Sequence, residues 1–286
     1  MSYVEIKTGL SEHLMYSTVR IECLLGDGTG STGTGFFFSF LEDGNMHVPA
    51  IVTNKHVVAG AIQGRFLMTV SDSEGNPKNE EHLPLQFDQF QSMWIFHPDP
   101  NVDLCIMPIA PLLKQADDIG KKLFFSSLTK DLIPTTEQLS ELSACEDVTM
   151  VGYPIGIWDQ INNLPLIRRG ITATHPKFNY NGKEEIMIDA ACYPGSSGSP
   201  VLVFNEGSFL TKNGLMAGTR VLFLGVMYGG PQFTATGEIA MMNIPTSPRP
   251  VAFSHIPMNL GLVIKAHKIL DFEELLSTQY KERLFL

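Results

Sequence analysis

Short apolar segments, each closed by a turn that contains glycine or proline, follow one another along most of the chain. They are rich in Val, Ile, Phe and Thr, which is typical of β-strands. Many short strands separated by such turns predict an all-β sandwich or barrel and argue against an alternating βαβ array. The predicted strands are Ser17–Leu25, Gly35–Leu41, Val48–Thr53, Asp103–Ile109, Val148–Gly152, Ile186–Ala191, Pro200–Phe204 and Val221–Tyr228.

Three regions depart from this pattern. Between Lys265 and Tyr280 the apolar residues recur with helical spacing, which predicts a helix that docks on one face. Pro111–Leu142 is polar and acidic and has the weakest strand pattern, so we interpret it as a connection between two halves. Pro231–Pro257 is rich in proline and is a candidate lid.

Charge and length exclude several classes of protein. The chain has 286 residues, enough for two compact domains or one large domain. Its 30 acidic and 20 basic side chains give a net charge of −10, which argues against binding to nucleic acid or to anionic membranes. We interpret the basic doublets Lys121-Lys122 and Arg168-Arg169 as solvated surface. No apolar run approaches the ~18 residues of a membrane-spanning helix, and the N-terminus lacks a secretory signal pattern.

The four cysteines are Cys23, Cys105, Cys145 and Cys192, and no two of them form a C-x-x-C pair. Three lie in apolar runs, the usual setting of a buried thiol. Disulfides or a metal site stay open, but reduced cysteines in a cytoplasmic protein are the preferred interpretation. Neither a zinc pattern nor an EF-hand loop is present, so we expect no metal and no cofactor. The glycine-rich run Gly26–Gly35 lacks the lysine of a phosphate-binding loop and is predicted to be a hairpin connection.

Residues 194–200 read Pro-Gly-Ser-Ser-Gly-Ser-Pro. Glycines let a backbone bend sharply and direct successive N–H groups toward one point. The pattern therefore predicts Ser197 as a nucleophile, with the N–H groups of Gly195 and Ser197 as an oxyanion hole. By itself, a cluster of Gly and Ser is more simply a loop.

A serine nucleophile needs a base, and the base needs an acid to orient it. His56 follows an apolar strand and Asp103 opens one, whereas the rival Asp99 lies in a Pro-Asp-Pro turn. The order His56, Asp103, Ser197 differs from that of α/β-hydrolases (Ser, acid, His) and of subtilisin-like enzymes (Asp, His, Ser). Three separately weak patterns thus agree in residue type, order and context.

Three motifs, Thr53–Val58, Asp103–Met107 and Asp189–Pro200, resemble those of trypsin-like (chymotrypsin-fold) serine peptidases. The last motif is most similar to the bacterial branch, including HtrA-type and V8-like enzymes. Gly152–Gly156 and Arg168–Ile171 resemble bacterial intracellular trypsin-like peptidases. The resemblance runs from about residue 15 to residue 265, and its most specific part is the serine motif.

The resemblance implies two six-stranded antiparallel β-barrels followed by a C-terminal helix. The first barrel, residues 12–113, would carry His56 and Asp103. Residues 114–142 would connect it to the second barrel, residues 143–262, which would carry Ser197 and the specificity pocket. Residues 263–286 would form the C-terminal helix and tail.

Two departures from the family bear on regulation. The classical secreted enzymes have an aspartate directly before the nucleophile, which pairs with the new N-terminus on zymogen activation, and here that residue is Ser196. Activation by insertion of an N-terminus is therefore not expected. No PDZ-like domain follows the barrels, which weakens the reading as an HtrA-type oligomeric chaperone-protease.

The resemblance also places a specificity pocket, formed by residues just before Ser197 and by the later strand Gly225–Gly230. Ala191 would lie at its base without a carboxylate, and Met227 replaces the histidine with which V8-like enzymes receive glutamate. We therefore expect a small or medium aliphatic P1 residue. If the register differs by two residues, the Asp189 carboxylate would instead lie at the bottom of the pocket. The expected substrate-binding residues are Ala191, Tyr193, Pro194, Met227, Tyr228, Gly229 and Gly230.

The sequence therefore predicts a serine endopeptidase that acts on proteins or peptides through an acyl-enzyme. Glycines at 229 and 230 would let an extended substrate add as an antiparallel strand, although a plain hairpin turn explains them equally. The alternative is a latent enzyme or a pseudo-protease, which binds peptides under the control of a regulatory partner.

Overall fold

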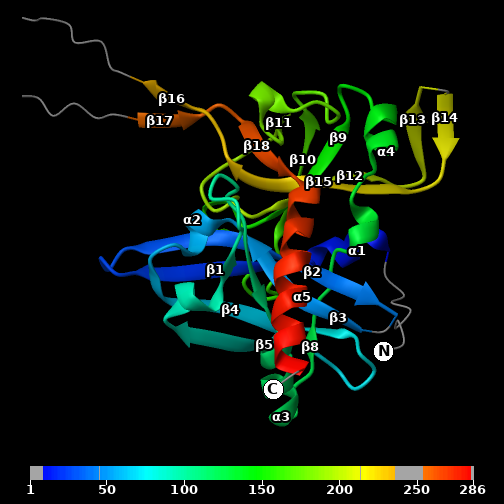
Figure 1. The fold of residues 1–286 in the computed structure, drawn as a ribbon. Coiled ribbons are helices and arrows are strands. Elements are labelled where there is room, and N and C mark those ends of the chain that lie inside the picture. Colours follow the sequence, from blue (N-terminus) through cyan, green and yellow to red (C-terminus); the bar gives the residue numbers. More distant parts are fainter. Residues whose placement is uncertain (1–8, 45, 213, 236–253, 285–286) are drawn as a thin grey trace, which may run out of the picture.

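The computed structural model describes residues 9–44, 46–212, 214–235 and 254–284. Most of the candidate lid, residues 236–253, lies outside the described residues. Strands dominate the fold and form two bodies that follow one another along the chain, with a long C-terminal helix beside them (Figure 1).

The N-terminal body is an eight-stranded antiparallel sheet with the order β5-β4-β1-β2-β3-β7-β6, in which β8 pairs with β4. Its strands are β1 (Thr18–Leu25), β2 (Gly30–Asp43), β3 (Met46–Thr53), β4 (Ala61–Ser71), β5 (Pro77–Asp88), β6 (Ile95–Phe96), β7 (Cys105–Pro108) and β8 (Leu123–Phe124).

This sheet differs from the expected six-stranded barrel. Its end strands β5 and β6 are joined in sequence by the 3₁₀ turn η1 (Phe90–Met93), and β6 has only two residues. Phe90 is fully buried against β4, where a Cβ on Gly64 would lie 2.1 Å from its ring. The turn thus packs against β4, and no ladder between β5 and β6 occurs in the described residues.

The C-terminal body is a closed six-stranded antiparallel barrel with the order β10-β11-β18-β15-β12-β9. This confirms one of the two barrels expected from the sequence. Two further strand pairs, β13 with β14 and β16 with β17, lie outside it. The strands are β9 (Asp147–Gly152), β10 (Leu166–Thr172), β11 (Glu185–Asp189), β12 (Pro200–Asn205), β13 (Ser208–Thr211), β14 (Gly214–Ala217), β15 (Arg220–Gly229), β16 (Gln232–Ala235), β17 (Ser254–Pro257) and β18 (Leu260–Lys265).

Every segment predicted as a strand overlaps an observed one. The glycine-rich run was predicted wrongly, because β2 already begins at Gly30 and only Gly26–Thr29 remain as a turn. A Cβ on Gly35 would lie 2.6 Å from a methyl group of Ile51. Close packing against the next strand, and not turn formation, therefore requires glycine at position 35.

Helices occupy the margins of the two bodies: α1 (Leu10–Met15), α2 (Lys55–Val58), α3 (Ala110–Asp118), α4 (Thr136–Glu141) and α5 (Asp271–Leu284), with the 3₁₀ turns η2 (Lys130–Leu132), η3 (Pro154–Gly156), η4 (Tyr180–Gly182) and η5 (Ala266–Leu270). The connecting segment thus carries α4, whose first turn is closed by a capping box between Thr135 and Gln138. No helix among the described residues is long and apolar enough to cross a membrane.

One hydrophobic cluster joins the two bodies. Phe36 of β2 and Phe223 of β15 pack edge to face with ring centroids 5.4 Å apart. Phe272 and Leu276 of α5 are fully buried in the same cluster. Figure 1 shows α5 lying along the N-terminal sheet and starting at the C-terminal barrel. Burial of these side chains fixes the seam between the two bodies, where the functional residues lie.

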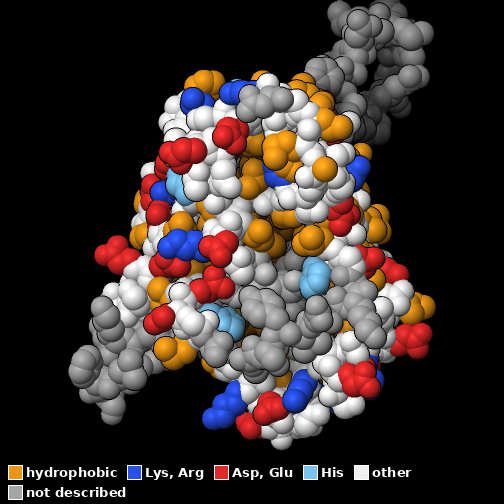
Figure 2. All heavy atoms as spheres, turned by 90° about the vertical axis from the view of Figure 1, so that its right-hand side faces the viewer, with side chains coloured by type: hydrophobic (Ala, Val, Ile, Leu, Met, Phe, Trp, Pro, Cys, Tyr) orange, Lys and Arg blue, Asp and Glu red, His pale blue; other side chains and the backbone are white. Residues whose placement is uncertain are grey.

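The β13–β14 hairpin projects from the C-terminal barrel and exposes Leu210 and Leu215. Figure 2 views the molecule from the side of this hairpin and shows hydrophobic side chains scattered among more acidic than basic groups. The acidic balance of the sequence is therefore visible on this face.

Candidate active site

His56 and Asp103 are brought together by the pairing of β3 with β7. Thr53 at the end of β3 lies opposite Cys105 at the start of β7. His56, in α2, and Asp103, just before β7, therefore meet beyond the same end of this ladder although 47 residues separate them in sequence. His56 Nδ1 lies 2.5 Å from Asp103 Oδ2, and the His56 N–H donates to Asp103 Oδ1 at 3.1 Å.

A third residue holds the backbone of this pair. The buried Asn54 donates from Nδ2 to the carbonyl oxygen of Asp103 at 2.7 Å. The imidazole itself stays open to solvent, with 49% of the His56 side chain exposed. An imidazole that is oriented through Nδ1 and reachable at Nε2 is suited to accept and return a proton.

The alternative acid, Asp99, accepts hydrogen bonds within its own turn. Its carboxylate accepts from the N–H of Asn101 at 2.8 Å, and this hydrogen bond is the main cause of the lowered pKa of Asp99. Its carbonyl oxygen accepts from Lys55 Nζ at 2.9 Å. The structure therefore places Asp103, and not Asp99, beside His56.

Ser197 lies in the loop between β11 and β12, and this loop needs its glycines. Gly195 and Gly198 have φ values of +86° and +87°, which L-residues with a side chain rarely adopt. A Cβ on Gly198 would lie 1.8 Å from the carbonyl oxygen of Thr34. The same Thr34 donates its N–H to Ser197 O at 2.9 Å, so β2 of the N-terminal sheet holds the loop of the barrel.

The Ser197 hydroxyl points toward β15 in this structure. Ser197 Oγ donates to the carbonyl oxygen of Tyr228 at 3.2 Å, and no described contact joins it to His56. The β15–β18 ladder shifts register between Met227 and Gly229, which leaves Tyr228 in a bulge without a ladder partner. Its carbonyl is therefore free to accept from the serine.

The peptide group between Pro194 and Gly195 is oriented by η3. Pro194 O accepts from the N–H of Ile155 at 2.6 Å. Because C=O and N–H of a trans peptide point in opposite directions, the Gly195 N–H faces away from Ile155. Among the described residues, neither this N–H nor that of Ser197 has a hydrogen-bond partner, as donors reserved for an oxyanion would require.

The expected pocket residues lie on both sides of Ser197. Tyr193 and Pro194 are exposed, Ala191 and Tyr228 are half-buried, and Met227 is buried. No atom lies within 4 Å of a Cβ built on Gly229, whereas one built on Gly230 would meet Leu260 O at 2.1 Å. The strand edge is thus open at Gly229 and closely packed at Gly230.

Asp189 faces away from this region. Along β11, Ile186 and Ile188 are buried in the barrel, whereas Asp189 is exposed. The alternation of a β-strand therefore directs the Asp189 carboxylate to solvent. A register in which it forms an acidic pocket base is not observed.

Arg168 contacts the loop before Ser197, which the sequence did not predict, because we interpreted its doublet as solvated surface. Its guanidinium Nη1 donates to Ala191 O and, at 3.0 Å, to Ser196 Oγ. Burial lowers its pKa. Along β10, Arg168, Gly170 and Thr172 face inward while Arg169 is exposed. The sequence gives no signal for this register, because the apolar Ile167 and Ile171 lie on the exposed side.

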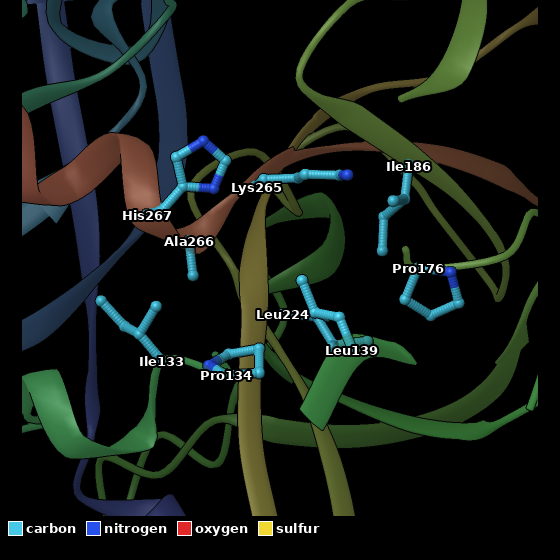
Figure 3. A pocket seen from close by; sticks show the side chains of 9 residues that line it. All are labelled: Ile133, Pro134, Leu139, Pro176, Ile186, Leu224, Lys265, Ala266 and His267. Carbon is cyan, nitrogen blue, oxygen red and sulfur yellow. The ribbon is translucent and has the colours of Figure 1, made fainter. Parts of the chain in front are cut away.

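The other described cavities lie away from these residues. Figure 3 shows one beside η5 with a volume of about 20 Å³, to which Lys265 and His267 contribute. A space of that size holds one water molecule. No group of three or more His, Cys, Asp or Glu suited to a metal ion occurs among the described residues, and all four cysteines are free.

Residues 33–211 match the family described as trypsin-like peptidase domain. The match spans more than half of the chain and includes His56, Asp103 and Ser197, so the chain belongs to the trypsin-like serine peptidases. No match was found among curated proteins.

Several solved structures are similar to this chain at low identity. "HtrA-type protease AlgW with tripeptide" is 15% identical, with a TM-score of 0.49, and the alignment covers 92% of this chain and 60% of that one. The Rv3671c protease from M. tuberculosis in its active form is 17% identical, with a TM-score of 0.43, covering 94% and 84%. Deg5 is 18% identical, with a TM-score of 0.42, covering 76% and 81%. The chain thus spans about three-fifths of the length of the AlgW structure.

Proposed function

We propose that this protein is a serine endopeptidase that cleaves peptide bonds through an acyl-enzyme. The observation that carries the proposal is the orientation of His56 by both oxygens of Asp103, together with a glycine-bounded turn at Ser197 that packs against Thr34 and Thr53 of the N-terminal sheet. Membership of the trypsin-like family supports the same chemistry.

In the proposed mechanism, Ser197 Oγ attacks the substrate carbonyl carbon while its proton passes to His56 Nε2. Asp103 keeps the imidazole in the tautomer with a proton on Nδ1 and stabilises the imidazolium that forms. The N–H groups of Gly195 and Ser197 stabilise the oxyanion. His56 then gives its proton to the leaving amine, and a water molecule repeats the sequence to release the acid and regenerate Ser197.

The substrate would bind as an extended strand along Tyr228–Gly230. Free backbone groups at a bulged strand can pair with a peptide, so that main-chain hydrogen bonds supply affinity. The absence of a carboxylate at Ala191 and the exposure of Asp189 favour the expected aliphatic P1 residue over Lys or Arg. Profiling with a peptide library tests this, and rapid cleavage after Lys or Arg would refute it. A cytoplasmic location, inferred from the cysteines, stays a prediction.

The second candidate is a latent enzyme. Its support is the hydrogen bond from Ser197 Oγ to Tyr228 O, which gives the hydroxyl proton an acceptor other than His56. In this alternative a partner or a bound peptide must take the Tyr228 carbonyl before the serine can meet the base. Rapid digestion of casein by the purified protein alone would argue against it.

The deciding experiment is labelling with a fluorophosphonate probe, followed by intact-mass analysis. We expect one adduct on the wild type, none on Ser197→Ala and much less on His56→Ala. Absence of any adduct on folded wild-type protein would overturn the active-enzyme proposal and leave the latent or peptide-binding alternative.

A further inference from the structure

Arg168 connects the two ends of the loop that precedes the nucleophile. Its Nη1 donates to the carbonyl oxygen of Ala191, at the start of the loop, and to Ser196 Oγ, next to Ser197. Ser196 is fully buried, and its Oγ also accepts from the N–H of Tyr193 at 3.3 Å. One guanidinium nitrogen and one hydroxyl thus fix three points between residues 191 and 196.

No carboxylate in the described part of the chain pairs with the Arg168 charge. Burial is the main cause of its lowered pKa, and the opposing groups, Cys192 and Tyr193, favour the cation only when they are ionised. Its Nε and Nη2 are shielded from solvent and have no hydrogen-bond partner among the described residues. A buried cation without an ion pair contributes little to stability. Such groups are more often retained for a functional site than for folding.

The Arg168 cation contacts Ser196, the position that carries an aspartate in the classical enzymes. In the classical enzymes of this family an aspartate at that position is held by the new N-terminus, and Ser196 cannot form that ion pair. The loop still carries two glycines at positive φ and two N–H groups without partners. Backbone of this kind keeps one conformation only if neighbouring groups hold it.

The loop is held from both sides. Thr34 Oγ1 donates to Gly195 O at 2.9 Å, and Ile155 donates to Pro194 O. These contacts act on the side of the N-terminal sheet and of η3. Arg168 contacts the buried side, from strand β10 of the barrel.

We propose that Arg168 is a positioning residue, which holds the 191–196 loop through Ala191 O and Ser196 Oγ so that the Gly195 and Ser197 N–H groups form the oxyanion hole without zymogen cleavage. The proposal rests on the proposed serine peptidase function. It also predicts that the unprocessed chain is competent, because the required cation is internal.

Loss of Arg168 should therefore lower kcat more than it raises KM. Removing a single oxyanion-hole donor typically costs about 10²–10³ in rate, and we expect Arg168→Met to fall in this range. Affinity for a peptide boronate, whose adduct places an oxygen in the oxyanion hole, should fall with kcat/KM. Arg168→Lys, which keeps one donor but loses the planar fork, should retain intermediate activity.

The test compares Arg168→Met and Arg168→Lys with Arg169→Met, which alters the exposed neighbour on the same strand. We would measure kcat, KM and boronate affinity, together with thermal melting. Addition of ethylguanidinium to Arg168→Ala should restore part of kcat, whereas the same concentration of NaCl should not. If Arg168→Met does not fold, Arg168→Lys and the rescue of Arg168→Ala carry the test.

Three results separate the possible failures. If the wild type neither turns over substrate nor reacts with a fluorophosphonate, the proposed function fails. If the wild type is active and folded Arg168 variants match Arg169→Met, the positioning role is wrong. If Arg168→Met changes which P1 residues are cleaved, for example by losing cleavage after Asp or Glu alone, Arg168 is a specificity residue and the proposal is also overturned.

Discussion

Ser197 Oγ and the carbonyl oxygen of Tyr228 are hydrogen-bonded at 3.2 Å and join the nucleophile loop to strand β15. The acceptor is available because Tyr228 lies in a bulge of the β15–β18 ladder. A peptide that adds along β15 would donate an N–H to the same carbonyl. Substrate binding and release of the serine hydroxyl toward His56 are therefore coupled at one oxygen atom.

This coupling predicts that N-methylation of the P1 amide slows cleavage beyond the loss of one hydrogen bond. The methylated substrate cannot compete for Tyr228 O, so the Ser197 hydroxyl stays hydrogen-bonded to that carbonyl. We expect kcat to fall as well as kcat/KM, measured against the unmethylated peptide. A substrate methylated at the P2 amide is the control, and equal kcat values for the two methylated substrates would contradict the coupling.

The glycines after Tyr228 should differ in what they do. A Cβ on Gly230 would meet Leu260 O at 2.1 Å, whereas one on Gly229 meets nothing within 4 Å. Gly230→Ala should therefore lower the melting temperature through backbone displacement. Gly229→Ala should melt like the wild type but raise KM for peptides, because its methyl group would stand where the substrate approaches. Differential scanning calorimetry and steady-state kinetics test both, and a normal KM in Gly229→Ala would place the peptide elsewhere.

Asp103→Asn should abolish most activity without unfolding the protein. The amide oxygen can still accept the His56 N–H, but an NH₂ facing Nδ1 favours the wrong imidazole tautomer. The expected loss in kcat is about 10⁴. Asp99→Asn is the matched control, because the Asp99 carboxylate accepts within its own turn. Comparable losses in the two variants would refute the assignment of Asp103.

The barrel strands were predictable because they follow local patterns, and the predicted pair of His56 and Asp103 does lie in contact. The catalytic roles of these two residues and of Ser197 stay predictions. The apolar composition of a segment such as Val221–Tyr228 is enough to predict a strand. Residue type, order and context related His56, Asp103 and Ser197. Arg168 was not predictable in this way. Its partners, Ala191 O and Ser196 Oγ, lie more than 20 residues away, and only the inward register of β10 distinguishes it from Arg169.

The N-terminal sheet shows a second limit of local patterns. Strand β5 carries many polar residues, such as Lys78 and Glu80, and so lacks an apolar run, whereas β4 contains the run Phe66–Val70 but was not predicted as a strand. Gly64 of β4 lies against the ring of Phe90 in η1, a contact between separate segments that neither segment indicates by itself. The number of strands in the N-terminal sheet and its closure depend on such packing, so the composition of single segments could not predict them.

Thr34 should be required for stability as well as for the loop. Its Oγ1 donates to Gly195 O at 2.9 Å and accepts from the Tyr153 N–H at 3.1 Å, both in the buried interior. Thr34→Val leaves two buried backbone groups without a partner, at a cost of about 1–3 kcal/mol each. Thr34→Ser keeps the hydroxyl and should lose much less. Urea unfolding measures both, and equal losses would show that packing of the methyl group, and not hydrogen bonding, is what counts.

The junction of α5 with the N-terminal sheet should weaken in acid through His97. The His97 side chain is fully buried against the Phe272 ring. Its Nδ1 accepts from the Asp99 N–H at 3.1 Å, so Nε2 carries the proton and faces Lys268 O at 3.2 Å and Asp271 Oδ2 at 3.2 Å. Burial is the main cause of the lowered pKa of His97, against the opposing effect of Asp271.

Because the folded pKa of His97 lies below the unfolded one, the unfolded state binds the proton more tightly. This contribution to stability is present above about pH 6.5, and it is lost as the pH falls through the folded pKa. We expect the free energy of unfolding, from urea titrations at pH 7.5, 6.5 and 5.5, to fall less steeply in His97→Gln than in the wild type. His47→Gln, at an exposed histidine, is the control and should follow the wild type. A wild-type slope in His97→Gln would show that other groups cause the acid sensitivity.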